Sequence, residues 1–305
     1  MEETAALFYK ELDALYDAGD LSQVEAFLLD AKKQAQGGGQ NLVMAQSELG
    51  AFYRGVGRFV EAIRAFLQAG EAIASVFGEE SAEYATNLNN LAGAYRMAGR
   101  HVEALPLFER AMRIYEKTIG AQTFHYASAL NNVALLHREL GAYQKAAAHT
   151  EESLAILEHC EDCEEQYATG LSNLAALYGL TGDAIKAKQT LALALSRFER
   201  LNYDNVHYAA ALCGLAAEQY NAGEYGRAKA TYEKAGAMLL SILGENTDYA
   251  AICEGMAQAC AKLGEWEAAV CREKQALAIY EKLLGPEHER AALCRARLAA
   301  WKERA

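Results

Sequence analysis

Apolar residues in the segment 84–99 recur with the spacing of a single helix face. Tyr84, Leu88 and Leu91 fall at positions i, i+4 and i+7, which is the period of an amphipathic α-helix. A second segment with the same period follows Gly99. No stretch of the chain shows the strict two-residue alternation of a half-buried strand. The pattern therefore predicts two helices joined by a tight turn.

This helical hairpin is one copy of a repeat that runs along the whole chain. Glycines that close the first helix of each pair recur at intervals of 38, 42, 42, 41, 41 and 41 residues, at Gly19, Gly57, Gly99, Gly141, Gly182, Gly223 and Gly264. Tyrosines that open first helices recur at intervals of 42, 41, 41 and 41 residues, each followed by alanine, at Tyr84, Tyr126, Tyr167, Tyr208 and Tyr249. Two helices in a period near 41 residues are typical of an α-solenoid.

Small residues and glycines mark where the helices meet and end. Alanines that let paired helices approach closely recur at Ala92, Ala111, Ala134, Ala175, Ala216 and Ala257. Glycines expected to form left-handed caps end the second helices, at Gly78, Gly120, Gly244 and Gly285. The joints at 159–163 and 201–204 lack such a glycine. We expect the local pitch to change at these two joints.

The markers predict an all-α fold and a single solenoid domain over residues 1–305. Residues 1–39 form a divergent helix pair that ends in a triple glycine, residues 40–285 hold six repeats, and residues 286–305 form a C-terminal capping helix. An atypical unit at each end is expected, because a terminal repeat has a neighbour on one side only. The prediction is seven helix pairs and one cap, hence fifteen helices.

Composition excludes several classes of protein. Of the 305 residues, 52% are hydrophobic and 23% charged, which argues against disorder. The net charge of −12 argues against nucleic acid or an anionic membrane surface as the main partner. The first residues lack the basic and apolar regions of a secretory signal, and no run of about 18 apolar residues occurs, so we expect neither secretion nor membrane insertion. Seven cysteines, an odd number within helical patterns, fit free thiols and a cytoplasmic protein.

The sequence predicts neither an enzyme nor a bound cofactor. It lacks the glycine-rich phosphate loop, the dinucleotide fingerprint, the zinc-protease motif and the serine nucleophile motif. His159-Cys160-x-x-Cys163 is the one metal-like spacing, but a structural zinc site needs four ligands and no second pair lies nearby. We therefore predict no metal site and a polar loop between repeats.

Three further residues are assigned to the core by their register. Cys253 and Cys294 stand where other repeats have leucine, and a buried free cysteine behaves as a small apolar residue. His137 replaces Tyr95 of the preceding repeat and is predicted to be a packed side chain.

One repeat carries enough of a known pattern to suggest a family. The chain resembles a tetratricopeptide-repeat protein of the longer variety typified by kinesin light chains, over residues 40–301 and more weakly over 1–39. The residues concerned are Leu88-Asn89-Asn90-Leu91-Ala92, Tyr95, Gly99, Glu103-Ala104-Leu105-Pro106-Leu107, Arg110-Ala111 and Ile114-Tyr115-Glu116-Lys117, with Leu284-Gly285-Pro286-Glu287-His288 resembling the linker. The resemblance implies a right-handed superhelix whose first helices line a concave groove for peptides or partner helices.

By the same resemblance, the groove carries residues just after the first leucine and near the end of each first helix. These are Asn89, Asn90, Asn131, Asn132, Ser172 and Asn173, and the arginines Arg54, Arg96 and Arg138. Asparagine amides can pair with the backbone of an extended peptide, and arginine can capture a carboxylate. Alternatively, the asparagines bridge neighbouring helices and the arginines offset helix dipoles.

The later repeats depart from this pattern. Cys213-Gly214 and Glu254-Gly255 replace the asparagine pair. A groove of asparagine and arginine is therefore expected only in the first half of the repeat array, and the second half binds a different ligand or none. The heptad segment of kinesin light chains is missing, which disfavours a motor adaptor.

We predict a protein-interaction scaffold that binds a peptide or partner segment in its groove. The alternative is a peptide-gated regulator or sensor that changes the superhelix pitch. Homo-oligomer formation through the solenoid ends is compatible with the sequence.

Overall fold

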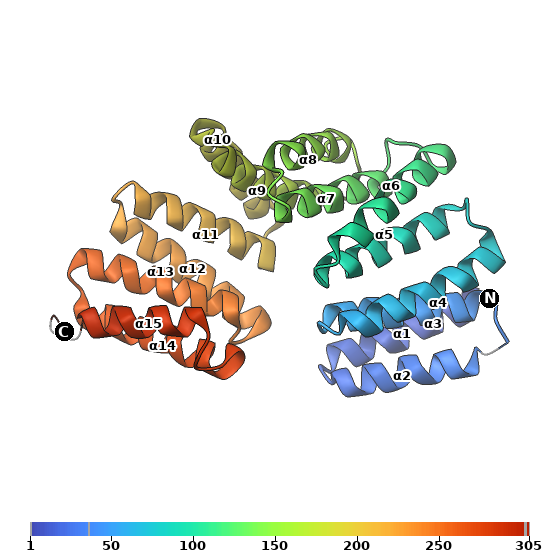
Figure 1. Cartoon of the computed structure of the whole chain (residues 1–305), viewed down its shortest axis with the longest axis horizontal. Helices are drawn as coiled ribbons and strands as arrows, with labels where there is room; N and C mark the ends of the chain where they lie inside the picture. Colours follow the sequence, from blue (N-terminus) through green and yellow to red (C-terminus); the bar gives the residue numbers. More distant parts are fainter. Residues whose placement is uncertain (1, 36, 302–303, 305) are drawn as a thin grey trace. The chain divides into compact units, whose positions relative to one another are not determined.

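The computed structural model of the chain describes residues 2–35, 37–301 and 304, with side chains from residue 5 onward. These residues form fifteen α-helices and no strand, as the sequence predicts (Figure 1). The helices α1 to α8 are Glu2–Asp17, Leu21–Gln34, Gln40–Gly55, Phe59–Phe77, Ala82–Met97, His101–Thr118, Phe124–Glu139 and Tyr143–Leu157. The helices α9 to α15 are Glu164–Thr181, Ala184–Leu201, Val206–Asn221, Tyr225–Leu243, Thr247–Leu263, Trp266–Leu284 and Glu289–Trp301.

The chain divides into two compact units, Met1–Cys160 and Glu161–Ala305, called unit 1 and unit 2 below. Within each unit, consecutive helices pack against one another. First helices also contact one another in the pairs α3 with α5, α5 with α7, α9 with α11 and α11 with α13. The predicted seven pairs and closing helix are confirmed for the described residues. The division falls in the joint at 159–163, where the sequence lacks a capping glycine. One continuous, right-handed solenoid over residues 1–305 stays a prediction.

Side-chain caps and glycines fix where the helices begin and end. Ser81, Thr123, Asn205 and Asn246 each accept a hydrogen bond from the amide of the opening tyrosine three residues later, at 2.7–3.4 Å. The four glycines predicted to end second helices all have positive φ, from 67° to 91°. Gly78, Gly244 and Gly285 combine this φ with an extended ψ of 158°, −161° and 156°, so the left-handed helical cap expected there is wrong for these three. At the second joint without glycine, Asn202 does adopt the left-handed conformation, with φ 57° and ψ 31°, which asparagine tolerates.

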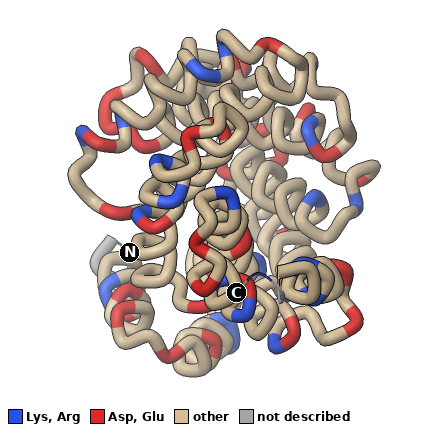
Figure 2. The backbone as a smooth tube through the Cα atoms, turned by 90° about the vertical axis from the view of Figure 1, so that its left-hand side faces the viewer, with Lys and Arg blue, Asp and Glu red and all other residues tan. Residues whose placement is uncertain are grey.

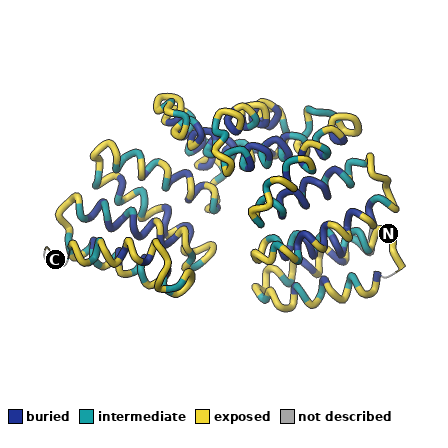
Figure 3. The backbone as a smooth tube through the Cα atoms, in the orientation of Figure 1, coloured by how far each residue is buried: buried dark blue, intermediate teal, exposed yellow. Residues whose placement is uncertain are grey.

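The core of each unit lies between the helices, at the positions that the repeat predicts. Ala92, Ala111, Ala216 and Ala257 are fully buried where helices approach one another. Buried positions follow the inward helix faces, and exposed positions follow the outer faces and turns (Figure 3). Cys253 and Cys294 are also fully buried, so their assignment to the core is confirmed.

The cysteines correct one expectation. Cys213, Cys253, Cys260, Cys271 and Cys294 are free thiols, as expected. Cys160 and Cys163, however, are disulfide-bonded, so the expectation of free thiols throughout is wrong for this pair. Asp162 between them has a φ of 58°, which turns the backbone within the loop.

Acidic and basic residues are interspersed over the helices rather than gathered in one basic stripe (Figure 2). None of the described helices combines the length and the apolar character that crossing a membrane requires.

A buried polar network joins the last helix to unit 2. The Arg297 side chain of α15 donates from Nε to Glu273 Oε1 at 2.7 Å and from Nη2 to Glu254 Oε1. Glu254 also accepts from the Tyr280 hydroxyl at 2.7 Å and from Arg290 Nη1 at 3.1 Å. Glu273 is fully buried, and burial raises the pKa of its carboxyl, while Arg297 opposes this rise. Two arginines, Arg297 and Arg290, therefore face two carboxylates that lie away from water, and Arg297 is the one that contacts both carboxylates.

The same cluster contains a set of atoms able to ligate a metal ion. Ligand atoms of Glu254, Glu273 and Cys294 lie within 4.8 Å of one another. Both carboxylates are already bonded to Arg297, and burial raises the pKa of the Cys294 thiol to about 12. This arrangement supports a protonated thiol and paired carboxylates, which hold α15 in place.

We expect Arg297→Met to lower the free energy of unfolding by about 3–5 kcal/mol, because it leaves the buried Glu273 carboxylate without a cation and leaves Glu254 with Arg290 alone. Arg295→Met is the matched control on the same helix, since Arg295 binds Glu281 in an exposed pair at 2.7 Å. An exposed pair contributes about 0–1 kcal/mol. Urea unfolding followed by circular dichroism measures both losses, and equal losses would contradict a special role for Arg297.

Candidate functional site

A row of polar side chains runs along the first helices of unit 1, and hydrogen bonds link its members. Arg54, in the last turn of α3, donates from Nη1 to Asn90 Oδ1 of α5 at 3.2 Å. Asn132 of α7 donates from Nδ2 to Asn89 Oδ1 of α5 at 3.1 Å. These four predicted residues thus bridge neighbouring first helices, and their contacts fix the side chains in place.

The arginines of this row carry positive charge that the structure only partly compensates. Arg96, in the last turn of α5, pairs with Glu139 at the end of α7, but its Nε is buried and has no hydrogen-bond partner. Glu139 also contacts His101 Nε2 at 3.3 Å. Burial and the nearby charge of Arg96 lower the pKa of Arg54. Arg54 and Arg96 therefore lie close enough to repel one another.

Two residues of the row have their polar groups available. Asn131 and Arg138, both on α7, are half-buried, and their side chains make no hydrogen bond or ion pair with another residue that the structure describes. Arg138 occupies the last turn of α7, as Arg96 does in α5. The remaining predicted residues, Ser172 and Asn173, are half-buried on α9 and belong to unit 2.

In unit 2, the first helices border an apolar cavity instead of a polar row. The cavity has a volume of about 530 Å³ and lies among α11, α12 and α13. Ala210 and Cys213 of α11 and Ala251 of α13 line it, with Tyr232 of α12 as an aromatic wall. Burial raises the pKa of the Cys213 thiol to about 11, so the thiol stays protonated at neutral pH.

Models of the tetratricopeptide repeat match residues 41–117 and 88–159, and a second such model matches residues 250–290. Together these matches cover more than half of the chain. The chain belongs to the tetratricopeptide-repeat family. A comparison with curated proteins found no significant match.

Solved structures show the same fold. BtubC (BKLC) from P. vanneervenii has a TM-score of 0.58 and 24% identity, over 66% of this chain and 82% of that one. A signal-transduction ATPase with a tetratricopeptide-repeat sensor from Pyrococcus horikoshii has a TM-score of 0.69 and 17% identity, over 92% of this chain and 40% of that one. A Rap protein complexed with competence and sporulation factor has a TM-score of 0.60 and 17% identity, over 99% and 98%.

One tetratricopeptide repeat departs from its neighbours at the turn between its helices. In two preceding repeats, Arg58 lies over the Tyr53 ring and Arg100 over the Tyr95 ring, each at 4.5 Å from the centroid. His137 takes the tyrosine position in the next repeat, where Ala142 replaces the arginine. His137 is half-buried rather than fully packed.

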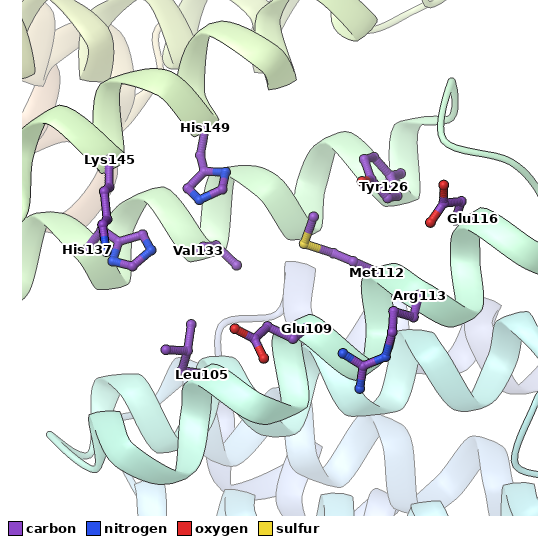
Figure 4. Close-up of a pocket in the computed structure, with 10 residues that line it drawn as sticks. All are labelled: Leu105, Glu109, Met112, Arg113, Glu116, Tyr126, Val133, His137, Lys145 and His149. Atoms are coloured by element: carbon purple, nitrogen blue, oxygen red, sulfur yellow. The ribbon is translucent and has the colours of Figure 1, made fainter.

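His137 stacks on His149 of α8 in a pocket of about 540 Å³ on the second-helix side of unit 1 (Figure 4). The two ring centroids are 5.4 Å apart and the planes differ by 6°. Burial, His149 and Lys145 lower the pKa of His137, while Glu109 opposes them. A protonated His137 is therefore disfavoured in the folded repeat.

Three residues of the two first-helix faces do not follow from the sequence pattern. Asn87 is buried and donates from Nδ2 to the Phe66 carbonyl at 3.0 Å, so it supports the fold beneath the polar row. Tyr232 and Asp248 line the cavity of unit 2. Gly255 offers a signal for Tyr232, because a Cβ at this helical position would lie 2.6 Å from the tyrosine ring.

We expect the free energy of unfolding to fall as the pH drops from about 7.5 to 5. The unfolded chain, with a histidine pKa near 6.5, binds more protons than the folded chain in this range, because the pKa of His137 is lowered in the folded state. The double variant His137→Tyr/Ala142→Arg restores the pair of the neighbouring repeats and should flatten this dependence. Denaturant unfolding at a series of pH values measures it.

His207→Gln removes an exposed histidine outside the stack and serves as the control for that experiment. A double variant with the same pH dependence as the wild-type chain would show that the stacked histidines do not set it.

Proposed function

We propose that the chain is a non-catalytic interaction scaffold whose first-helix face in unit 1 binds an extended peptide or partner segment. Tetratricopeptide repeats are protein-interaction modules, so membership of this family supports a protein partner in general. The choice of this face rests on Arg138 and Asn131, whose side chains have no partner among the described residues. It also rests on Arg96, whose buried Nε has no hydrogen-bond partner.

The chemistry of this face suits a polypeptide that carries a carboxylate. The amide of Asn131 can donate to a peptide carbonyl and accept from a peptide N–H. Arg138 presents a guanidinium with no ion-pair partner among the described residues, and a guanidinium can bind a carboxylate through two parallel hydrogen bonds. The carboxylate would come from an acidic side chain or from the C-terminus of the partner.

The bonded members of the row support this role by limiting motion. Arg54 is held by Asn90, and Asn89 by Asn132, before any ligand arrives. A face that is already ordered loses less conformational entropy on binding. Glu139 neutralises Arg96 from within the chain, and an incoming carboxylate would share or replace this contact.

An arrayed peptide library, with each peptide as a free acid and as a C-terminal amide, tests the proposal. We expect selected peptides to contain a carboxylate and to lose about ten- to a hundredfold in affinity with Arg138→Gln, as for a lost charged hydrogen bond. Fluorescence polarisation with labelled peptides measures the change. Arg113→Gln, an exposed arginine of α6 in the second-helix pocket, makes the same charge change elsewhere and is the control.

Equal losses in the two variants would mean that general charge attraction, rather than this face, binds the peptides. A library without any selected peptide would contradict the proposal as a whole.

A second candidate function is a peptide-gated regulator. Two observations support it: the chain divides at a joint that lacks a capping glycine, and its fold is similar to that of a Rap protein complexed with competence and sporulation factor. Small-angle scattering with and without a selected peptide is expected to show a changed radius of gyration in this case. An unchanged radius of gyration would contradict the regulator and leave the scaffold as the one remaining candidate function.

A further inference from the structure

The apolar cavity of unit 2 has the size and lining of a ligand site. Its volume of about 530 Å³ falls in the range of roughly 300–1,000 Å³ found for small-molecule sites. Val206, Leu239 and Ile252 contribute apolar side chains. Leu239 and Ile252 are themselves buried and form part of the core of unit 2, so the cavity reaches down to packed side chains.

Residues beside this cavity differ from the asparagine pair that unit 1 has at the same repeat positions. Cys213-Gly214 stands where the earlier repeats have the asparagine pair, and Glu254-Gly255 does so one repeat later. The missing side chain of Gly255 makes room for the Tyr232 ring, because an added Cβ would lie 2.6 Å from it. Tyr232 then stands as one wall of the cavity. The cavity thus results from a coordinated change of residues on α11, α12 and α13.

One charged side chain lies among the ten described residues that line the cavity. It is Asp248, the second residue of α13. Its backbone N–H donates to Asn246 Oδ1 at 3.0 Å, but its carboxylate makes no hydrogen bond or ion pair with a described residue. The carboxylate lies close enough to the Cys213 thiol to add to the rise in the pKa of that thiol, after burial. Asp248 is exposed and lies in the first turn of α13, where a helix N-terminus favours a negative charge. The cavity therefore combines an apolar interior with one solvent-accessible carboxylate that has no cationic partner among the described residues.

We propose that the cavity of unit 2 binds an aliphatic cation, with its apolar chain against Leu239 and Ile252 and its ammonium group at Asp248. Burying the chain removes apolar surface from water, and the carboxylate selects the cation over the corresponding anion. This site lies in a different unit from the peptide face proposed above and does not depend on it.

Isothermal titration calorimetry on the full chain, with octylammonium as the probe, tests this site. We expect octylammonium to bind at least tenfold more tightly than octanoate, which has a similar chain and the opposite charge. Butylammonium should also bind at least tenfold more weakly, because it buries half as much chain. Since a protein of net charge −12 attracts cations in general, the comparison of chain lengths separates the cavity from the surface.

Matched variants locate the binding. Asp248→Asn should remove the preference for octylammonium over octanoate. Glu267→Gln changes the same charge at the second residue of α14, outside the cavity, and should leave the preference intact. Ala251→Phe fills the cavity from an exposed position and should weaken octylammonium binding at least tenfold. Circular dichroism verifies that each variant is folded.

The aliphatic cation could be a free amine or a leucine and lysine pair in a polypeptide. Acetyl-Leu-Lys-amide presents the second form, and its affinity relative to octylammonium shows which source fits the cavity better. Arg138→Gln is expected to leave both affinities unchanged, so that failure of the peptide face and failure of this site are distinguishable.

Three results would overturn the proposal. Octanoate that binds as tightly as octylammonium would remove the role of Asp248. Unchanged binding by Ala251→Phe would place the probe elsewhere. No measurable binding of either octylammonium or the dipeptide would show that the cavity does not take this class of ligand.

Discussion

The close approach of neighbouring helices is the constraint on which the structure depends. A helical hairpin of this length cannot bury its apolar faces alone, so every repeat takes part of its core from the next. Buried alanines such as Ala92 and Ala111 allow neighbouring helices to approach closely enough to share this core. In unit 2, the buried contacts of Arg297 with Glu254 and Glu273 add a directional polar network to this packing and fasten α15 to α13 and α14.

The same dependence on neighbours explains the polar row of unit 1. First helices that lie side by side bring residues one repeat apart into contact, such as Asn89 with Asn132 and Arg96 with Glu139. Bridging between helices and the peptide binding that we propose therefore fall to different members of one row. The bonded residues order the surface, while Asn131 and Arg138 keep their polar groups available.

Much of the fold could be predicted from the sequence because its signals are local and periodic. The spacing of tyrosines and glycines placed the helices, and the alanines and Cys253 were assigned to the core by register alone. The candidate sites were harder to predict, because a contact such as that between Arg297 and Glu254 joins residues 43 positions apart. Nothing in the helical period tells which polar side chains face one another. The disulfide state of Cys160 and the cavity beside Tyr232 also depend on how backbone segments meet.

The cavity shows how a repeat changes its chemistry without changing its fold. The positions that hold the repeats together are the alanines, the caps and the glycine turns, and unit 2 keeps them. The asparagine pair of unit 1 bridges neighbouring first helices through hydrogen bonds, and in unit 2 Cys213 and Gly214 stand at these positions in the same fold. The family models match residues 41–159 and 250–290, and the residues between these ranges include α9 and α10 as well as α11 and α12. A change of lining residues on an otherwise common scaffold is what the separate ligand specificity that we propose for unit 2 requires.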